Sequence, residues 1–113
     1  MESRTDLVHA LCRLDAEAVT EWASDDVAVF APDDRIATPG VVDGRGRTTL
    51  RVAVDVLAAW SGRPLRLDAQ AHDPVATVLE LATRDGRPVT ARLRWEAGVL
   101  ADVRLYFDPE DTV

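Results

Sequence analysis

Four short segments in the last third of the chain alternate apolar and polar residues, and this alternation most constrains the fold. The segments are Leu65–Ala71, Val75–Thr83, Arg87–Trp95 and Val99–Phe107. A period of two predicts strands that turn one apolar face inward. Because only a few residues connect the segments, neighbouring strands are expected to pair as antiparallel hairpins. The sequence therefore predicts a four-stranded meander over residues 65–107.

The connections between these segments predict how the strands are aligned. Each is interpreted as a three-residue loop: His72-Asp73-Pro74, Arg84-Asp85-Gly86 and Glu96-Ala97-Gly98. The two that end in glycine suit a type I turn followed by a left-handed residue. With these loops, apolar residues lie opposite one another: Leu67 and Leu79, Leu79 and Ala91, Ala91 and Val103. A two-residue turn at either glycine is not expected, because it would set leucines opposite arginines.

The apolar face of the predicted sheet contains no acid, base or nucleophile. Its members are Leu67, Thr77, Leu79, Ala91, Leu93, Trp95, Val103, Leu105 and Phe107. One interpretation is a simple hydrophobic core. The other is an apolar pocket at the open end of a curved sheet, since Ala91 and Ala101 leave room there and small-molecule sites are mostly apolar. Both interpretations remain open from the sequence.

The polar face of the same sheet carries charges that the predicted register sets against each other. Arg66 would face Glu80 and Arg92 would face Asp102, while Thr90 would lie between Glu80 and Arg104. Opposite charges directly across strands attract weakly. The face is expected to be either solvated or the contact of a homodimer. The dimer would use Arg66, Glu80, Arg92, Asp102, Arg104 and Tyr106.

The first sixty residues contain helical patterns and one loop. Predicted elements are a helix from Thr5-Asp6 with Leu7, Ala10, Leu11 and Leu14 inward, a helix Ala16–Ala23 capped by Asp15, a strand 27–30 and a helix Thr48–Trp60 ended by Ser61-Gly62. The segment Pro32–Gly46 is interpreted as a loop, with a second strand inside it near Ile36 or Val41-Val42. The predicted class is α+β, with helices packed against one curved antiparallel sheet.

Composition limits the classes of partner. The 113 residues make one domain, 1–113, and a net charge of −7 disfavours nucleic acid and anionic membranes. Early charges at Glu2, Arg4 and Asp6 argue against a signal peptide, and the single Cys12 rules out an internal disulfide, so a cytoplasmic location is expected. Lysine and asparagine are both absent, which suggests a GC-rich, actinobacterial genome.

Over almost its whole length, the chain resembles the nuclear transport factor 2-like superfamily, within its SnoaL-like and ketosteroid isomerase-like branch, and three segments carry the resemblance. They are Leu14-Asp15-Ala16-Glu17-Ala18 through Asp25-Asp26-Val27, then Gly44-Arg45-Gly46-Arg47-Thr48-Thr49-Leu50, then the closing strand Gly98 to Pro109. The resemblance implies a cone of helices and curved sheet, often dimeric. It also implies a hydrophobic pocket used for isomerisation, cyclisation, epoxide opening or plain binding.

The catalytic residues of the ketosteroid isomerase-like branch do not carry over. That chemistry needs a carboxylate base and donors that stabilise an enolate. The resemblance puts the base position on Ala31, the tyrosine position on Leu7 and the second acid position on Ala91, all apolar. A steroid isomerase mechanism of the known kind is therefore not expected.

Few residues remain as candidates for chemistry. Asp33 and Asp34 follow the vacant base position, and His72 precedes an acid at a strand turn. Solvated turns are the simpler explanation of all three. His9 and His72 are too far apart in the sequence to predict a metal site, and neither metal nor cofactor is expected. Ligand contacts are predicted at Leu7, Leu11, Trp22, Val29, Ala31, Trp60, Thr77, Ala91, Trp95, Val103, Leu105 and Phe107.

Two hypotheses for function follow. In the first, the protein is an isomerase or cyclase of secondary metabolism that holds a small apolar metabolite in a reactive shape. In the second, it is a non-catalytic ligand-binding or dimerisation module of the same fold.

Overall fold

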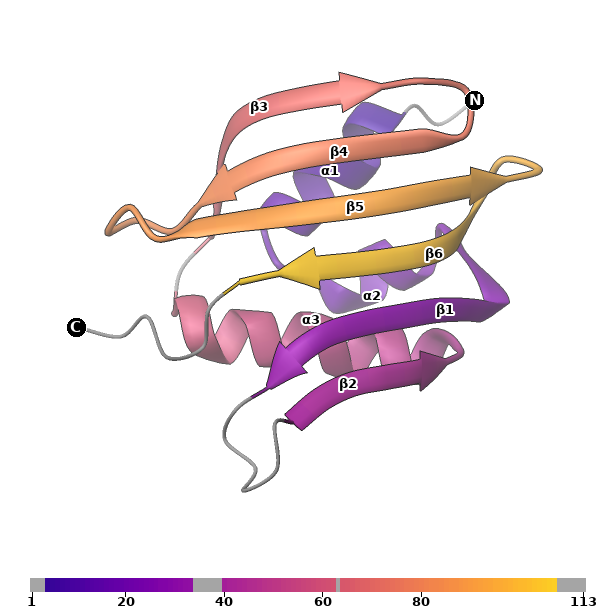
Figure 1. Ribbon diagram of the computed structural model, residues 1–113, viewed down its shortest axis with the longest axis horizontal. Coiled ribbons are helices and arrows are strands. Elements are labelled where there is room, and N and C mark those ends of the chain that lie inside the picture. Colours follow the sequence, from indigo (N-terminus) through magenta and orange to yellow (C-terminus); the bar gives the residue numbers. More distant parts are fainter. Residues whose placement is uncertain (1–3, 34–39, 63, 108–113) are drawn as a thin grey trace.

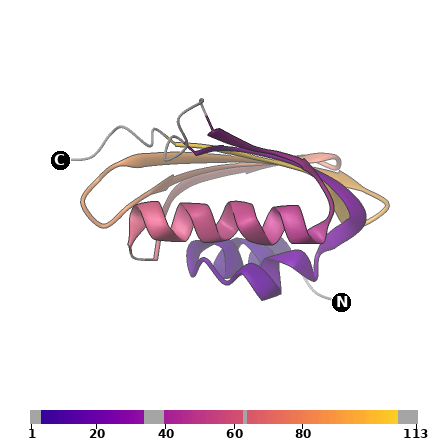
Figure 2. The same ribbon diagram turned by 90° about the horizontal axis from the view of Figure 1, so that it is seen from below.

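A six-stranded sheet and three helices form two layers, with all the helices on one face of the sheet (Figures 1 and 2). The computed structural model describes residues 4–33, 40–62 and 64–107. Its elements are α1 (Arg4–Cys12), α2 (Ala16–Thr20), β1 (Ala23–Asp33), β2 (Gly40–Arg45), α3 (Arg47–Ser61), β3 (Arg66–His72), β4 (Ala76–Ala82), β5 (Pro88–Glu96) and β6 (Val99–Tyr106). Within the described part of the chain, no helix is both long and apolar enough to cross a bilayer.

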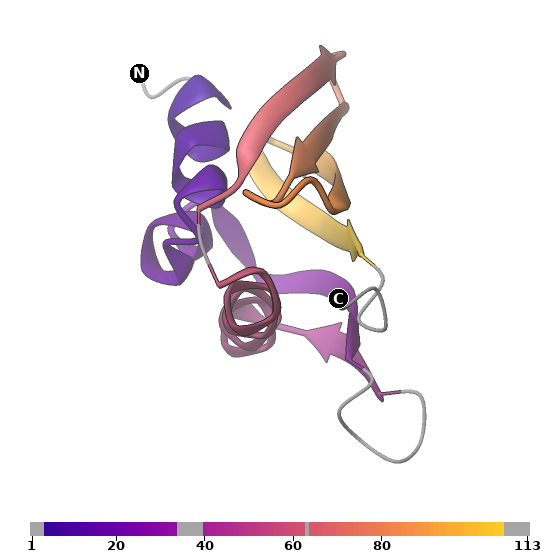
Figure 3. The same ribbon diagram turned by 90° about the vertical axis from the view of Figure 1, so that its left-hand side faces the viewer.

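The strand order β2-β1-β6-β5-β4-β3 confirms the predicted α+β class, including the second N-terminal strand at Val41-Val42. One pairing differs from a purely antiparallel sheet: β1 and β6 run parallel, so the sheet is mixed. The sheet curves over the helices, with α3 beneath β1 and β2 and α1 towards β3 and β4 (Figure 3). The inner face of the sheet is the one that the helices cover.

The helix ends follow local chemistry. Helix α1 closes with two bonds, from Asp15 N–H to the Ala10 carbonyl and from Leu14 N–H to the Leu11 carbonyl, around Leu14 at φ 58°. Asp15 caps α2 as predicted, since its carboxylate accepts from the Ala18 N–H at 3.2 Å. The predicted extension of α2 to Ala23 was wrong, because Ala23 already starts β1.

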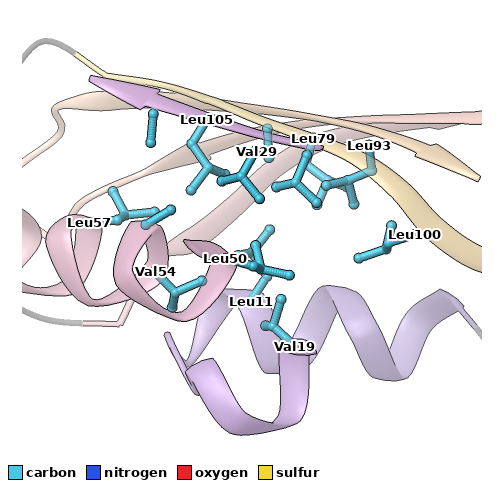
Figure 4. Close-up of a cluster of buried hydrophobic side chains, with 14 of the residues drawn as sticks. Leu11, Val19, Val29, Leu50, Val54, Leu57, Leu79, Leu93, Leu100 and Leu105 are labelled. Atoms are coloured by element: carbon cyan, nitrogen blue, oxygen red, sulfur yellow. The ribbon is translucent and has the colours of Figure 1, made fainter. Parts of the chain in front are cut away.

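The core lies between the two layers, and large aliphatic side chains from every helix and from the central strands meet there. The labelled members of this cluster are Leu11, Val19, Val29, Leu50, Val54, Leu57, Leu79, Leu93, Leu100 and Leu105 (Figure 4). Every one of them is at most 3% exposed. Burial of that apolar surface is the main force that holds the helices to the sheet.

The β4–β5 hairpin has the predicted alignment. Leu81 pairs with Val89 and Leu79 with Ala91, and the Thr83 N–H donates to the Arg87 carbonyl at 2.9 Å around the three-residue loop. The predicted alignment of its two neighbours was wrong.

The β5–β6 hairpin uses the two-residue turn that the alternation had argued against. Ala97 and Gly98 both have positive φ, 53° and 83°, which is the geometry of a type I′ turn, and Glu96 pairs directly with Val99. A β-bulge at Ala101 then restores the alternation, so that Val103 pairs with Leu93 rather than Ala91. As a result Leu100, and not Val99, is the buried residue at the start of β6.

The β3–β4 hairpin combines a tight turn and a bulge in the same way. The Asp73 carboxylate accepts from the Val75 and Ala76 N–H groups at 2.8 and 2.7 Å and so holds a turn shorter than predicted. The register shifts again at Asp68, which keeps Leu67 on the inner face opposite Leu81. Beyond the bulge, the residues of β3 that lie on the inner face are Gln70 and His72, instead of the predicted Ala69 and Ala71.

Candidate functional site

Eleven of the twelve residues predicted to contact a ligand belong to the hydrophobic core or pack against it, and the twelfth, Thr77, is a buried polar residue. Ten of the twelve are at most 7% exposed, and Trp22 and Trp60 are half-buried. The structure therefore brings all twelve to the inner side of the sheet. Their own side chains fill much of the space between the sheet and the helices.

The positions that the isomerase chemistry would need are apolar and buried. Leu7, Ala31 and Ala91 are 1%, 0% and 0% exposed. Asp33 is the last residue of β1, and Asp34 lies outside the described residues.

Aromatic pairs close the two ends of the core. The ring centroids of Trp22 and Trp95 lie 5.9 Å apart, edge to face, at the C-terminal end of β5. Trp60 and Phe107 lie 4.8 Å apart at the C-terminal end of α3, and the Arg87 guanidinium lies 4.2 Å from the Trp60 ring centroid. The indole N–H of Trp60 is buried and has no acceptor among the described residues.

A chain of four polar side chains lies at the Trp95 end of the inner face. The Trp95 indole N–H donates to the Thr77 hydroxyl at 3.0 Å, and Thr77 Oγ1 lies 3.1 Å from Nδ1 of His72. Nε2 of His72 lies 2.8 Å from Oε1 of Gln70. The chain runs from a buried indole to the exposed edge strand β3.

The register of β3 places this chain on the inner face. Gln70 pairs with Leu79 and His72 with Thr77, and paired residues share a face of the sheet. Leu79 and Thr77 are 0% and 1% exposed, yet Gln70 and His72 are exposed. The inner face is thus open to solvent along β3, and the prediction that it carries no base was wrong at His72.

Three shallow hollows lie elsewhere on the described surface. Two of them, of about 330 and 390 Å³, adjoin each other on the outer face and share Asp102 and Arg104. The third, of about 310 Å³, lies between α1 and α2 and is lined by His9, Arg13 and Trp22 among others. Among the described residues, no three side chains gather that could hold a metal ion.

The outer face keeps the predicted charged residues but pairs them differently. Arg92 lies opposite Arg104, Arg94 lies opposite Asp102, and Thr90 lies opposite Tyr106. Arg66 pairs with Ala82 rather than Glu80, whereas the predicted pairing of Glu80 with Thr90 is confirmed. Ion pairs run along the strands instead, as in Arg104–Asp102 and Arg94–Glu96, both at 3.3 Å.

Cys12 shows no sign of activation. Its side chain packs against the core, and burial raises the pKa of its thiol, with a smaller opposite effect from Arg13. A thiol of this kind is a packing group rather than a nucleophile.

Comparison with known proteins identifies the fold. No family model matches the sequence, and no curated protein matches it. Solved structures do match. An NTF2-like protein of unknown function from Burkholderia pseudomallei is 16% identical, with a TM-score of 0.67 over 94% of this chain and 88% of that one. A SnoaL-like protein of unknown function from Burkholderia thailandensis is 12% identical, with a TM-score of 0.69 over 92% and 89%.

A de novo designed protein with a curved β-sheet is also similar, at 18% identity and a TM-score of 0.71 over 96% of this chain and 90% of that one. The chain therefore has the nuclear transport factor 2-like fold, as the sequence resemblance predicted. At these identities the likeness shows the fold alone, and function has to be argued from the site.

Proposed function

We propose that the protein binds a small, largely apolar molecule on the inner face of the sheet beside β3, without altering it. The observation that carries this proposal is the exposure of Gln70 and His72 on a face whose remaining residues form the core. A polar group at the edge of an apolar surface is the usual composition of a small-molecule site.

The surroundings of the polar chain support an apolar ligand. Leu67 on the same strand is half-buried and packs against the core, and Trp22 lies half-buried against Trp95. Covering such half-exposed surface contributes about 25 cal/mol per Å² of apolar area. The neighbouring buried positions of the inner face carry no ionisable group that would repel an apolar molecule.

A matched pair of substitutions on β3 tests the position of the site. Gln70 and Ala71 are adjacent and exposed, but Gln70 lies on the inner face and Ala71, opposite Val78, on the outer face. With 2-octanone as the probe, we expect Gln70→Trp to block binding and Ala71→Trp to leave it intact.

Thermal denaturation provides the measurement. Ligand at a hundred times its dissociation constant adds about 2.7 kcal/mol of stability, or about 10 °C in Tm for a chain of this length. Mass spectrometry should recover the ketone unchanged. Equal loss of the shift in both variants, or loss only in Ala71→Trp, would disprove this location. Loss of the shift only in Ala71→Trp would indicate that Ala71 lies on the inner face, as the register predicted from alternation has it.

A second candidate is catalysis by an isomerase or cyclase that works mainly by holding its substrate in shape. What favours it is His72, whose ring has a hydroxyl on one side and an amide on the other within hydrogen-bond distance. A histidine so placed has the reach of a general base. Asp33 and Asp34 remain the other candidate bases.

Exchange of α-hydrogens tests proton transfer directly. If a base acts, 2-octanone in D₂O should gain deuterium faster in the presence of the protein, as followed by NMR. The base is His72 if His72→Gln abolishes the acceleration, and a loop carboxylate if Asp33→Asn with Asp34→Asn does. Exchange no faster than in buffer would eliminate this candidate and leave binding alone.

We also propose that the outer face of the sheet is the contact of a homodimer. In support, this face carries both signs of charge, Val75 is 60% exposed beside the arginines, and Arg92 has no ion pair within the described residues. A two-fold axis would let one such mixed patch contact its own copy. Arg104→Glu should weaken self-association in sedimentation, whereas Arg51→Glu on the exposed side of α3 should not. Equal sedimentation of both variants and the parent would argue against this face.

A further inference from the structure

We infer that His72 presents an N–H to the ligand, so that the polar end of the bound molecule is a hydrogen-bond acceptor such as a ketone or ester carbonyl. This inference rests on the proposed binding function and specifies the chemistry of the ligand. It follows from the direction of each hydrogen bond in the chain from Trp95 to Gln70.

The direction is set at the buried end. An indole nitrogen can only donate, so the bond between Trp95 and Thr77 uses one lone pair of the Thr77 oxygen. The Thr77 hydroxyl hydrogen then needs an acceptor of its own. Thr77 is 1% exposed, so bulk water does not supply one.

His72 supplies that acceptor. Its Nδ1 lies 3.1 Å from Thr77 Oγ1, and among the described residues the Thr77 hydroxyl has no hydrogen-bond partner besides Trp95 and His72. If Nδ1 carried a proton, it could donate only to the second lone pair of Thr77 Oγ1, and the buried hydroxyl hydrogen would be left without an acceptor among the described residues, which is unfavourable. Nδ1 is therefore the acceptor, and the proton of the neutral ring sits on Nε2.

The protonated Nε2 faces the solvent-exposed end of the chain. It donates to Oε1 of Gln70 at 2.8 Å, an amide orientation that agrees with this direction. Because both side chains are exposed, an arriving carbonyl oxygen can replace the amide oxygen at little cost. Thr77 thus acts as a positioning residue, since it touches His72 and not the ligand.

The first test reads the tautomer without any ligand. The chain has two histidines, so His9→Gln leaves the imidazole of His72 as the only one in the spectrum. Long-range proton–nitrogen NMR spectra in mildly alkaline buffer should show hydrogen on Nε2. Thr77→Ser should keep this pattern because it keeps the hydroxyl, and Thr77→Val should give a mixture of tautomers. Hydrogen on Nδ1 in the parent spectrum would overturn the inference.

The second test compares three eight-carbon probes by their effect on Tm. 2-Octanone only accepts hydrogen bonds, octylammonium only donates them, and octane does neither. We expect the ketone to bind roughly tenfold more tightly than octane, the value of one good hydrogen bond. His72→Phe should remove that preference and leave octane unaffected.

The two tests separate the possible failures. Tighter binding of octylammonium than of the ketone, or an equal affinity for ketone and octane, would overturn the acceptor assignment while the binding function stood. If none of the three probes shifted the Tm, the binding function and the ligand assignment would both be wrong. The NMR spectra would still show whether the direction of the chain was correct.

Discussion

The hydrogen bond between Thr77 and Trp95 makes a quantitative prediction about stability. Thr77→Val keeps the shape of the side chain and removes the hydroxyl that accepts from the Trp95 indole N–H at 3.0 Å. Trp95 is 6% exposed, so the donor would be left almost without water. An unsatisfied buried donor costs about 1–3 kcal/mol, and the added methyl group recovers part of that.

We therefore expect Thr77→Val to lower the free energy of unfolding by about 1–2 kcal/mol. Unfolding entropy of about 2.1 cal/mol/K per residue converts this to a fall of roughly 4–8 °C in Tm for 113 residues. Urea denaturation should show an unchanged slope and a lower midpoint.

A double-mutant cycle isolates the bond from the other effects of each change. Trp95→Phe removes the donor, so adding Thr77→Val to it should cost much less than adding it to the parent. The coupling energy should be about 1–2 kcal/mol. Thr90→Val is the matched control, because Thr90 is a half-buried threonine of the same sheet whose side chain makes no hydrogen bond among the described residues, and it should change stability by at most about 0.5 kcal/mol. Additive effects of Thr77→Val and Trp95→Phe would refute the reasoning.

Three further predictions concern turns and caps. The pKa of the Asp85 carboxyl is lowered, first by the Thr83 hydroxyl and then by Arg87; its contribution to stability is present above the carboxyl's ordinary pKa and is lost as the pH falls through the lowered one. Asp85→Asn should therefore be destabilising at neutral pH but not in strong acid, as acid titration of the Tm would show; a constant difference would contradict this. Ala97→Asn should raise the free energy of unfolding by about 0.5–1 kcal/mol, because asparagine tolerates the positive φ of 53° at this turn better than alanine does. Urea denaturation measures this change, and a lower free energy of unfolding would contradict the prediction. Asp15→Ala should cost about 0.5–2 kcal/mol through loss of the α2 cap, and Asp15→Ser should retain most of that stability if the cap is the reason.

Much of the fold could be predicted because its causes are local. The period-two alternation from Leu65 to Phe107 depends only on which side chains favour burial, and it correctly predicted four strands and one apolar face. The cap at Asp15 and the end of α3 at Gly62, where φ is 70°, are also decided by a few neighbouring residues.

The alignment of two hairpins could not be predicted from alternation. Each contains a shorter turn and a compensating bulge, and the two changes together leave most apolar residues inward. The alternation of apolar and polar residues is therefore almost the same for either alignment of the strands, and the geometry of the turn decides between the two alignments. The sequence did contain one indication of the tight turn at Asp73. An aspartate side chain commonly accepts from N–H groups two and three residues further on, as Asp73 does from Val75 and Ala76, and this favours a tight turn.

The candidate site depends on those same bulges. Counted by alternation, Gln70 and His72 belong to the outer face, and His72 is only a turn residue. The shift at Asp68 moves both inward, and the β4–β5 pairing brings Thr77 and Trp95 to meet them. No sequence pattern reports this meeting, since the four residues come from three strands.

The amino-acid sequence by itself determined the strands, the helices and their apolar sides, because burial preference is a property of single positions. It also determined that the isomerase tyrosine is absent at Leu7 and the isomerase acids are absent at Ala31 and Ala91, because residue identity is fixed at each position. Tertiary structure decided that β1 joins β6 in parallel and that a histidine stands at the open edge of the inner face. Both outcomes depend on how strands are aligned in three dimensions, and one residue of slip reverses the face to which a side chain belongs.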